Sequence, residues 1–213
     1  MSHRVLILGT RTLAEELSDL ISEVPGWEVA GFVENMEPEK CGRTLAGLPV
    51  YWVDELAVMA QSHVAVCGLA TVHRSRFIDQ AAALGVKTVT FVHPTARISR
   101  TAVVGDGCFV SPLTVVSSNT VLGAQVFLNR GVLVGHHTKI GSYCTLQPGA
   151  NIAGCVHLGP RTYVGMGALV LDNLKIGELC VVGAGAVVTR DLPDRVQAIG
   201  MPAKIVKTGI EGK

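Results

Sequence analysis

A six-residue repeat is the strongest constraint that the sequence places on the fold. From Ile98 to Val188 every sixth residue, sixteen in all, is Ile, Leu or Val, whereas only 15 of the other 79 positions between 98 and 192 hold these residues. A fixed hexapeptide period predicts a parallel β-helix, whose coils stack their aliphatic side chains into one interior. The period never shifts, so we expect no loop to interrupt the coils.

Two further positions of the repeat are restricted. Glycine stands one place after the aliphatic residue in eight of the sixteen hexads, and the fourth place is mostly small. The second and third places are expected to point outward. Charged residues make up 16% of the chain, against ~25% in a typical soluble domain. Either some apolar surface is therefore exposed, or a partner subunit covers it.

The first 92 residues follow a different pattern, in which short apolar runs alternate with helical periodicity. This alternation predicts a parallel sheet in a Rossmann-like α/β domain over 1–92, followed by a β-helix domain with a C-terminal tail over 93–213. Ligands of such sheets bind outside the carboxyl ends of the strands. Strands are expected at 4–8, 29–33, 49–52, 64–67 and 86–91, helices at 12–22, 53–61 and 71–84, and a loop at 34–47.

Charge and composition exclude several classes of function. The net charge is +1, and no run of Lys or Arg exceeds two residues, so we expect no nucleic-acid partner. No apolar stretch approaches the ~18 residues of a membrane span, and the apolar run at the start is too short for a signal peptide. We therefore expect a cytoplasmic protein with no membrane contact. Six Cys without a CxxC pair indicate neither a zinc site nor a disulfide framework.

The hexapeptide pattern resembles that of the left-handed β-helix acyltransferases. The whole chain is similar to bacterial sugar O-/N-acetyltransferases of the PglD/NeuD type, which join a Rossmann-like domain to such a helix, and Ile199–Lys204 is similar to their G-x-P-A-K ending. The resemblance implies three hexads per triangular coil, so that residues 18 apart stack. It also implies acetyl-CoA as co-substrate, no metal, a homotrimer and a nucleotide-linked amino sugar as acceptor.

His136 is the candidate general base. It holds an outward place and stacks between Ser118 and Gly154, which leaves room for a thin ligand beside an imidazole, the usual base near neutral pH. The resemblance implies that His136 deprotonates the acceptor. The next family position is usually acidic, but here it is His137, which would oppose an imidazolium if protonated. Either another carboxylate supports His136, or the base is weaker.

The remaining β-helix candidates rest on the resemblance, each with a structural alternative. Asn129 is expected to contact the acceptor or to serve only as a turn residue. Thr145 replaces a family His that contacts acetyl-CoA, and it is either a hydrogen-bond donor or a strand Thr between aromatic rings. The backbone of Gly154, Met166 and Ala184 is expected along the pantetheine arm of CoA, and Lys204 either meets a CoA phosphate or is solvated.

The N-terminal ligand loop departs from the family. Its fingerprint is roughly G-x-G-G-H, whereas Gly9–Leu13 holds one glycine. Thr12 is expected to cap the following helix, whose N-terminus attracts anions, and Arg11 to supply phosphate-binding charge. The alternative is a vestigial domain that only packs against the β-helix. The residues expected to bind the nucleotide sugar are Gly9, Thr10, Arg11, Thr12, Glu34, Asn35 and Gly68.

The sequence thus predicts an acetyl-CoA-dependent N-acetyltransferase acting on a nucleotide-linked amino sugar, with a His base and an active site between subunits of a trimer. Two alternatives remain open. One is a sugar O-acetyltransferase with a sialic-acid-like acceptor, because the sequence does not report the acceptor atom. The other is a non-catalytic β-helix scaffold, which the altered N-terminal loop and His137 favour.

Overall fold

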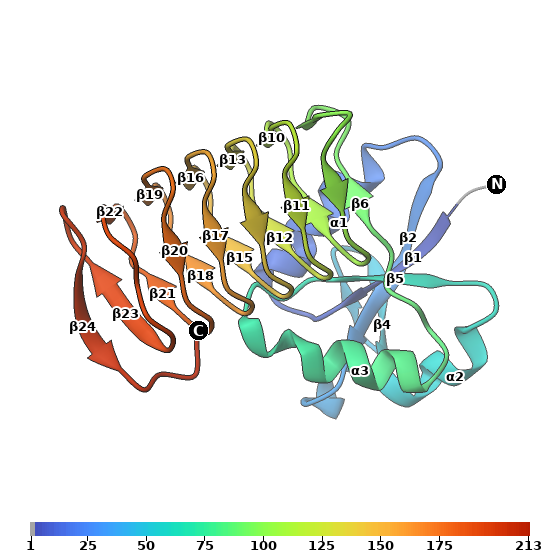
Figure 1. Cartoon of the computed structure of the whole chain (residues 1–213). Helices are drawn as coiled ribbons and strands as arrows, with labels where there is room; N and C mark the ends of the chain where they lie inside the picture. Colours follow the sequence, from blue (N-terminus) through green and yellow to red (C-terminus); the bar gives the residue numbers. More distant parts are fainter. Residues whose placement is uncertain (1–2) are drawn as a thin grey trace. The chain divides into compact units, whose positions relative to one another are not determined.

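The computed structural model describes residues 3–213, so the first two residues of the predicted N-terminal domain lie outside the described residues. The chain clusters into two compact units, Met1–His93 and Pro94–Lys213, which we call unit 1 and unit 2 (Figure 1). Between residues 3 and 213 the structure contains no helix that is both long enough and apolar enough to span a bilayer.

Unit 1 is built on a five-stranded sheet in the order β3-β4-β2-β1-β5. The pairs β1·β2, β1·β5 and β2·β4 are parallel, and only the short edge strand β3 runs antiparallel to its neighbour. The sheet is therefore mixed. Its strands are β1 (His3–Leu8), β2 (Trp27–Glu34), β3 (Thr44–Leu45), β4 (Leu48–Trp52) and β5 (Val64–Cys67), and β6 (Phe91–Val92) ends the unit.

The helices of unit 1 form where apolar residues recur at helical spacing. In α1 (Thr12–Ser22) the buried Leu17 and Ile21 lie four residues apart and therefore on one face. The other helices are α2 (Leu56–Met59), α3 (Ser75–Ala83) and the 3₁₀ turns Pro38–Lys40, Val53–Glu55 and Val72–Arg74.

Three local expectations for unit 1 were wrong. Thr12 is the first helical residue rather than the cap, since the N-cap is Arg11, which makes no side-chain capping bond. The span 34–47 contains a 3₁₀ turn and β3 instead of one loop. Of the strand expected at 86–91, residues 86–90 form one isolated bridge, between Ala65 and Thr88, and only Phe91 belongs to a strand, β6.

Unit 2 is a parallel β-helix, consistent with the left-handed type. Its strands form three parallel sheets, in which each residue pairs with the residue 18 positions further on, as Val116 does with Val134. Three hexads therefore make one coil. We call the sheets I (β22-β19-β16-β13-β10-β7), II (β20-β17-β14-β11-β8) and III (β24-β23-β21-β18-β15-β12-β9). A corner is named by the two sheets that it joins.

The strands of unit 2 are mostly two residues long. Sheet I contains β7 (Arg97–Ile98), β10 (Val115–Val116), β13 (Leu133–Val134), β16 (Asn151–Ile152), β19 (Leu169–Val170) and β22 (Val187–Val188). Sheet II contains β8 (Val103–Val104), β11 (Val121–Leu122), β14 (Lys139–Ile140), β17 (His157–Leu158) and β20 (Lys175–Ile176). Sheet III contains β9 (Phe109–Val110), β12 (Phe127–Leu128), β15 (Thr145–Leu146), β18 (Tyr163–Val164), β21 (Val181–Val182), β23 (Val196–Ile199) and the antiparallel β24 (Lys204–Thr208).

The hexad aliphatics form the interior, as predicted. Every one from Val110 to Val188 is at most 2% exposed, and Ile98 and Val104 are partly buried against them. The fourth-place residues share this interior. The hydroxyls of Thr120, Thr138 and Thr162 each donate to the backbone carbonyl 15 residues on, and the Cys108 and Cys144 thiols do the same. Polar groups therefore enter the core with partners, which avoids the cost of an unsatisfied buried donor.

The glycine position of the repeat has a steric cause. A Cβ on Gly141 would lie 2.5 Å from the backbone N of Pro160 in the next coil, and one on Gly135 would lie 2.5 Å from Ala153 C. At such distances backbone would have to move. Glycine here lets the coils stack at the spacing that the ladder bonds require.

Candidate active site

His136 and His137 occupy the turn after β13, at a corner between sheets I and II. Both are exposed, because the second and third places of a hexad face outward. Their Nδ1 atoms lie 3.1 Å apart, and the rings meet edge to face at 84°. His137 has φ +56°, the left-handed conformation that third-place residues adopt at most corners, so its backbone is ordinary for this fold.

The coils above and below contact this histidine pair. A Cβ on Gly154, one coil above, would lie 2.8 Å from both Cε1 and Nε2 of His136, so the absence of a side chain makes room for the ring. From the coil below, Asn119 Nδ2 lies 3.1 Å from His137 Nε2. Among the described residues, no hydrogen bond or ion pair brings a carboxylate to His136, and its identified contacts are with His137 and Gly154.

Asn129, Met166 and Ala184 lie at a different corner, between sheets III and I. Asn129 is buried, and its Oδ1 accepts from the Arg130 backbone N–H at 2.8 Å, a turn-forming role. Its Nδ2 is 3.5 Å from Gln147 Oε1. Met166 and Ala184 are exposed. Within one chain the candidate residues therefore fall into two groups, separated by the width of sheet I.

Thr145 and Lys204 lie apart from both groups. Thr145 pairs between Phe127 and Tyr163 in sheet III and is fully buried, so its hydroxyl does not face open solvent. Lys204 begins β24, directly after the Met201–Pro202 turn, and is exposed. A phosphate can reach Lys204 without rearrangement of the chain.

In unit 1 the predicted loop residues gather at the carboxyl ends of β1, β2 and β5. The Thr10 hydroxyl donates to Glu34 Oε2, and the exposed Arg11 lies 3.4 Å from Glu37. Gly68 serves packing, because a Cβ there would lie 2.8 Å from Ile7 Cγ2. Gly9 has φ +123°, which favours glycine.

The Glu34 carboxylate is hydrogen-bonded by groups of its own loop. Its Oε1 accepts from the backbone N–H groups of Asn35 and Met36 at 2.8 and 2.9 Å, and Lys40 Nζ lies 3.8 Å from Oε2. Sequence reasoning missed Lys40, which also bonds Glu37 at 2.6 Å. Its only sequence signal was a positive charge in the expected loop 34–47. Asn35 is held differently, since its Nδ2 donates to Gln80 Oε1 at 3.0 Å.

Two small hollows flank Thr10. One measures about 60 Å³ and lies between the loops at Gly9 and Glu34, and the other measures about 180 Å³ beside Lys40 and Arg43. Small-molecule pockets usually measure ~300–1,000 Å³. A nucleotide here would therefore rest on an open surface, and Arg11 would have to leave Glu37 to reach its phosphates.

We expect Glu34→Gln to destabilise the protein at pH 7 but not in acid. Burial pushes the pKa of Glu34 upward, but hydrogen bonds from Thr10, Met36 and Asn35 outweigh it, so the pKa lies below the usual value. A lowered pKa in the folded state contributes stability above the unfolded value of 4.5 that is lost as pH falls through the folded pKa. Urea unfolding should show a loss of about 1–3 kcal/mol at pH 7, shrinking below pH 4.5.

Glu39→Gln is the matched control for this measurement, because Glu39 is exposed and its loss should change stability by less than about 0.5 kcal/mol. A Glu34→Gln difference that stays constant from pH 7 to below 4.5 would contradict the role given to the Glu34 charge.

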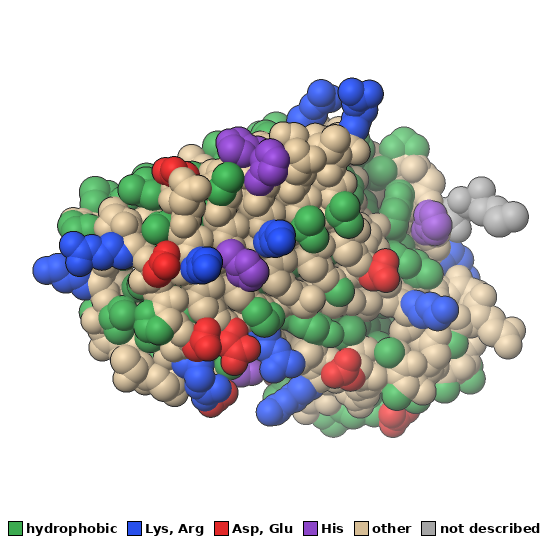
Figure 2. Space-filling view, in the orientation of Figure 1, with side chains coloured by type: hydrophobic (Ala, Val, Ile, Leu, Met, Phe, Trp, Pro, Cys, Tyr) green, Lys and Arg blue, Asp and Glu red, His purple; other side chains and the backbone are tan. Residues whose placement is uncertain are grey.

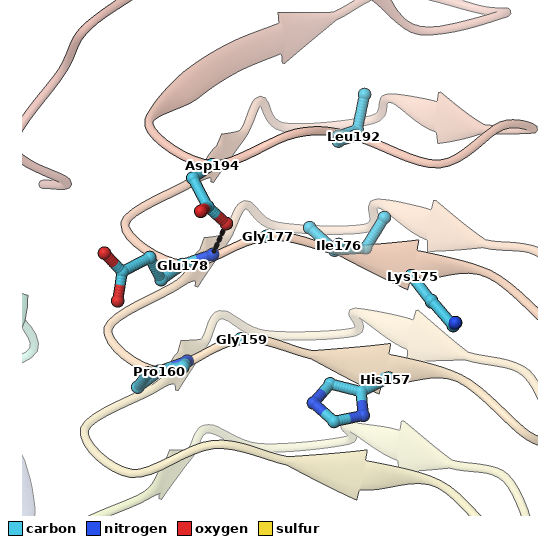
Figure 3. Close-up of a pocket in the computed structure, with 9 residues that line it drawn as sticks. All are labelled: His157, Gly159, Pro160, Lys175, Ile176, Gly177, Glu178, Leu192 and Asp194. Atoms are coloured by element: carbon cyan, nitrogen blue, oxygen red, sulfur yellow. Dashed lines mark hydrogen bonds between the residues drawn. The ribbon is translucent and has the colours of Figure 1, made fainter.

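An open depression of about 550 Å³ lies elsewhere, on the outer side of sheet II (Figure 3). His157 and Lys175 line it, and Asp194 accepts from the Glu178 backbone N–H at 2.9 Å. None of the residues singled out from the sequence lines this depression. It is therefore distinct from the His136 corner.

Comparison with known proteins supports one family for the whole chain. Residues 155–190 match the family model "Bacterial transferase hexapeptide (six repeats)". A variant of perosamine N-acetyltransferase from Caulobacter crescentus, in complex with CoA and GDP-perosamine, has a TM-score of 0.89 and 31% identity, with 96% of this chain and 97% of that chain covered. No curated protein sequence matches the chain.

Two further structures resemble the chain over its full span. WeeI from Acinetobacter baumannii has a TM-score of 0.87 and 26% identity, with 96% of this chain and all of that chain covered. The acetyltransferase domain of PglB from Neisseria gonorrhoeae has a TM-score of 0.88 and 25% identity, with the same coverage. Identity of 31% over almost the whole of one relative shows that this chain belongs to the hexapeptide-repeat family of sugar acetyltransferases.

Proposed function

We propose that the protein transfers the acetyl group of acetyl-CoA to the amino group of a nucleotide-linked sugar. The observation that carries this proposal is the similarity of both units to perosamine N-acetyltransferase in complex with CoA and GDP-perosamine. The exposed imidazole of His136, lying against Gly154, adds a group of suitable chemistry for acyl transfer.

In the proposed reaction His136 Nε2 takes a proton from the sugar amine as the amine nitrogen bonds to the acetyl carbonyl carbon. The C–S bond then breaks, and the CoA thiolate leaves and receives that proton. Backbone N–H groups near the corner stabilise the developing oxyanion. Gly154, Met166 and Ala184 lie along the pantetheine arm, Lys204 meets a CoA phosphate, and Asn129 contacts the acceptor. Thr145 is fully buried and has a structural role in sheet III.

We propose further that the active site lies between copies in a homotrimer. His136 and Gly154 lie at the corner between sheets I and II, whereas Met166 and Ala184 lie at the corner between sheets III and I. Two chains therefore bring these residues together more readily than one. On the visible face of the coils, Figure 2 shows charged and hydrophobic side chains interspersed, with no large area of one charge. Three outer residues of sheet I are apolar yet exposed, with Val115 at 37%, Leu133 at 42% and Leu169 at 38%. Such patches usually mark contact surfaces.

Unit 1 is proposed as a Rossmann-like domain that binds the nucleotide. Strands β2 and β4 lie on one side of β1 and β5 on the other, so the strand order reverses at β1. Crevices at such switch points are where ligands bind in α/β sheets. The loop at Gly9–Thr12, Glu34, Asn35 and Gly68 all lie at this edge.

The direct test is to incubate the purified full chain with acetyl-CoA and a panel of GDP-, UDP- and dTDP-linked amino sugars, with free thiol as the readout and mass spectrometry of the product. We expect thiol release and a hydroxylamine-stable acetamide with at least one acceptor. A hydroxylamine-labile ester would favour the O-acetyltransferase. The absence of both thiol release and acetyl-CoA binding would favour the scaffold.

Arg11→Ala tests the role of unit 1 separately. Losing one hydrogen bond to a charged phosphate costs about 1.5–3 kcal/mol, so we expect KM for the nucleotide sugar to rise by roughly 10- to 100-fold with KM for acetyl-CoA unchanged. Arg4→Ala is the control, because Arg4 is also exposed but lies at the opposite end of β1. Equal effects of the two substitutions would contradict nucleotide binding at this edge.

A further inference from the structure

A chain of hydrogen bonds runs from the coil below into the candidate base. The Asn119 backbone N–H donates to Thr101 Oγ1 at 3.0 Å, Asn119 Nδ2 lies 3.1 Å from His137 Nε2, and His137 Nδ1 lies 3.1 Å from His136 Nδ1. Asn119 and His137 are both third-place residues, 18 apart, with φ of +58° and +56°. The solenoid register therefore holds these side chains together.

The facing Nδ1 atoms restrict how the two rings are protonated. A neutral imidazole has one N–H donor and one acceptor nitrogen, so one Nδ1 must donate to the other. If His137 donates, the proton of His136 lies on Nε2, and that nitrogen cannot take another from an amine. If His136 donates, its Nε2, which lies beside Gly154, carries the lone pair of a base.

The amide of Asn119 selects between these two states. With Nδ2 toward His137, the amide donates to Nε2, which places the His137 proton on Nδ1 and the His136 proton on Nε2. A half-turn of the amide about χ2 presents Oδ1 instead. The carbonyl then accepts from His137 Nε2–H, His137 Nδ1 accepts from His136 Nδ1–H, and His136 Nε2 is free to act.

We propose that Asn119 is a positioning residue that acts through His137. A half-turn of its amide, from the orientation in this structure with Nδ2 toward His137 to one with Oδ1 toward His137, moves the His136 proton to Nδ1 for catalysis. This neutral relay takes the place of the carboxylate that relatives usually carry after the catalytic histidine. The effect of this relay on kcat rests on the proposed function, because it requires that the enzyme transfers an acetyl group. When His136 Nε2 takes the amine proton, its Nδ1–H remains bonded to a polarised acceptor.

The first test is independent of catalysis. Imidazole ¹⁵N chemical shifts of the full-length, substrate-free protein at pH 8 report which nitrogen carries each proton. We expect His136 protonated at Nε2 in the wild type, at Nδ1 in Asn119→Asp, whose carboxylate only accepts, and a mixture of tautomers in Asn119→Leu. The same His136 tautomer in the wild type, Asn119→Asp and Asn119→Leu would overturn the inference.

The second test is kinetic. We expect Asn119→Leu to lower kcat about tenfold with both KM values unchanged, and Asn119→Asp to restore it. His137→Glu supplies a carboxylate directly, so in that background the loss caused by Asn119→Leu should shrink to less than twofold. Leucine suits this backbone, since Leu113 and Leu179 adopt the same conformation at other corners.

Asn173→Leu is the matched control, because Asn173 lies in the same column with φ +62° but bonds Asp172 instead of a histidine. Its kcat should equal that of the wild type. A tenfold loss in Asn119→Leu that Asn119→Asp fails to restore would point to a structural role and overturn the inference. If the wild type transfers no acetyl group, the proposed function fails, while the tautomer measurement still decides the relay.

Discussion

Replacing His136 with alanine is expected to lower kcat for acetyl transfer by about 10²- to 10⁴-fold, the usual contribution of a general base. KM for acetyl-CoA and for the acceptor should change little, because the imidazole acts on the proton in transfer. Thermal unfolding should also stay the same, since His136 is exposed. Thiol release at saturating substrate measures the first effect and calorimetry the second.

His157→Ala is the control for this prediction, because His157 is an exposed histidine on sheet II, one coil further on. Its kcat should match the wild type. Full activity in His136→Ala would show that another group takes the proton. The relay through Asn119 would then have no effect on kcat.

Leu146→Ala is expected to lower the free energy of unfolding by about 2–5 kcal/mol. Leu146 is fully buried and stacks between Leu128 and Val164 in the interior of the coils. Neighbouring coils cannot close the cavity, because each is held in register by ladder bonds. In a solenoid the stability of each coil depends on its contacts with the neighbouring coils. The packing lost at one coil therefore lowers the stability of the whole unit. Urea unfolding at one fixed protein concentration measures the effect.

Leu113→Ala serves as the matched control, because Leu113 is 68% exposed at a corner and its truncation should cost less than about 0.5 kcal/mol. If the two substitutions lowered the free energy of unfolding by similar amounts, this would contradict the claim that the hexad aliphatics stabilise unit 2.

Prediction from the sequence succeeded best where structure repeats. The hexad period places every aliphatic residue in one interior column, because a strand reverses its side chains at each residue and each corner adds the same number of residues. Reading residues 18 apart also identified the contact between His136 and Gly154. The same reading pairs Asn119 with His137, and that column was the available signal for a residue which sequence reasoning passed over.

Prediction was weaker in unit 1, where no period fixes the elements. The helix at Thr12–Ser22 and the strand at Val64–Cys67 have the expected bounds, because each has a clear apolar pattern. The span 86–91 has apolar residues too, yet residues 86–90 form only one isolated bridge and a strand begins at Phe91. Whether such a segment forms a strand depends on a partner backbone that lies far away in the sequence.

The sequence alone therefore determined the coil, its interior and the family resemblance that selects His136, because these follow from residue spacing. Only the tertiary structure decided what the polar side chains do. It directed the Glu34 carboxylate onto its own loop, placed Asn129 and His136 at different corners, and brought Asn119, His137 and His136 within hydrogen-bond distance. These outcomes depend on side-chain torsions and on partners from neighbouring coils, which one-dimensional spacing does not specify.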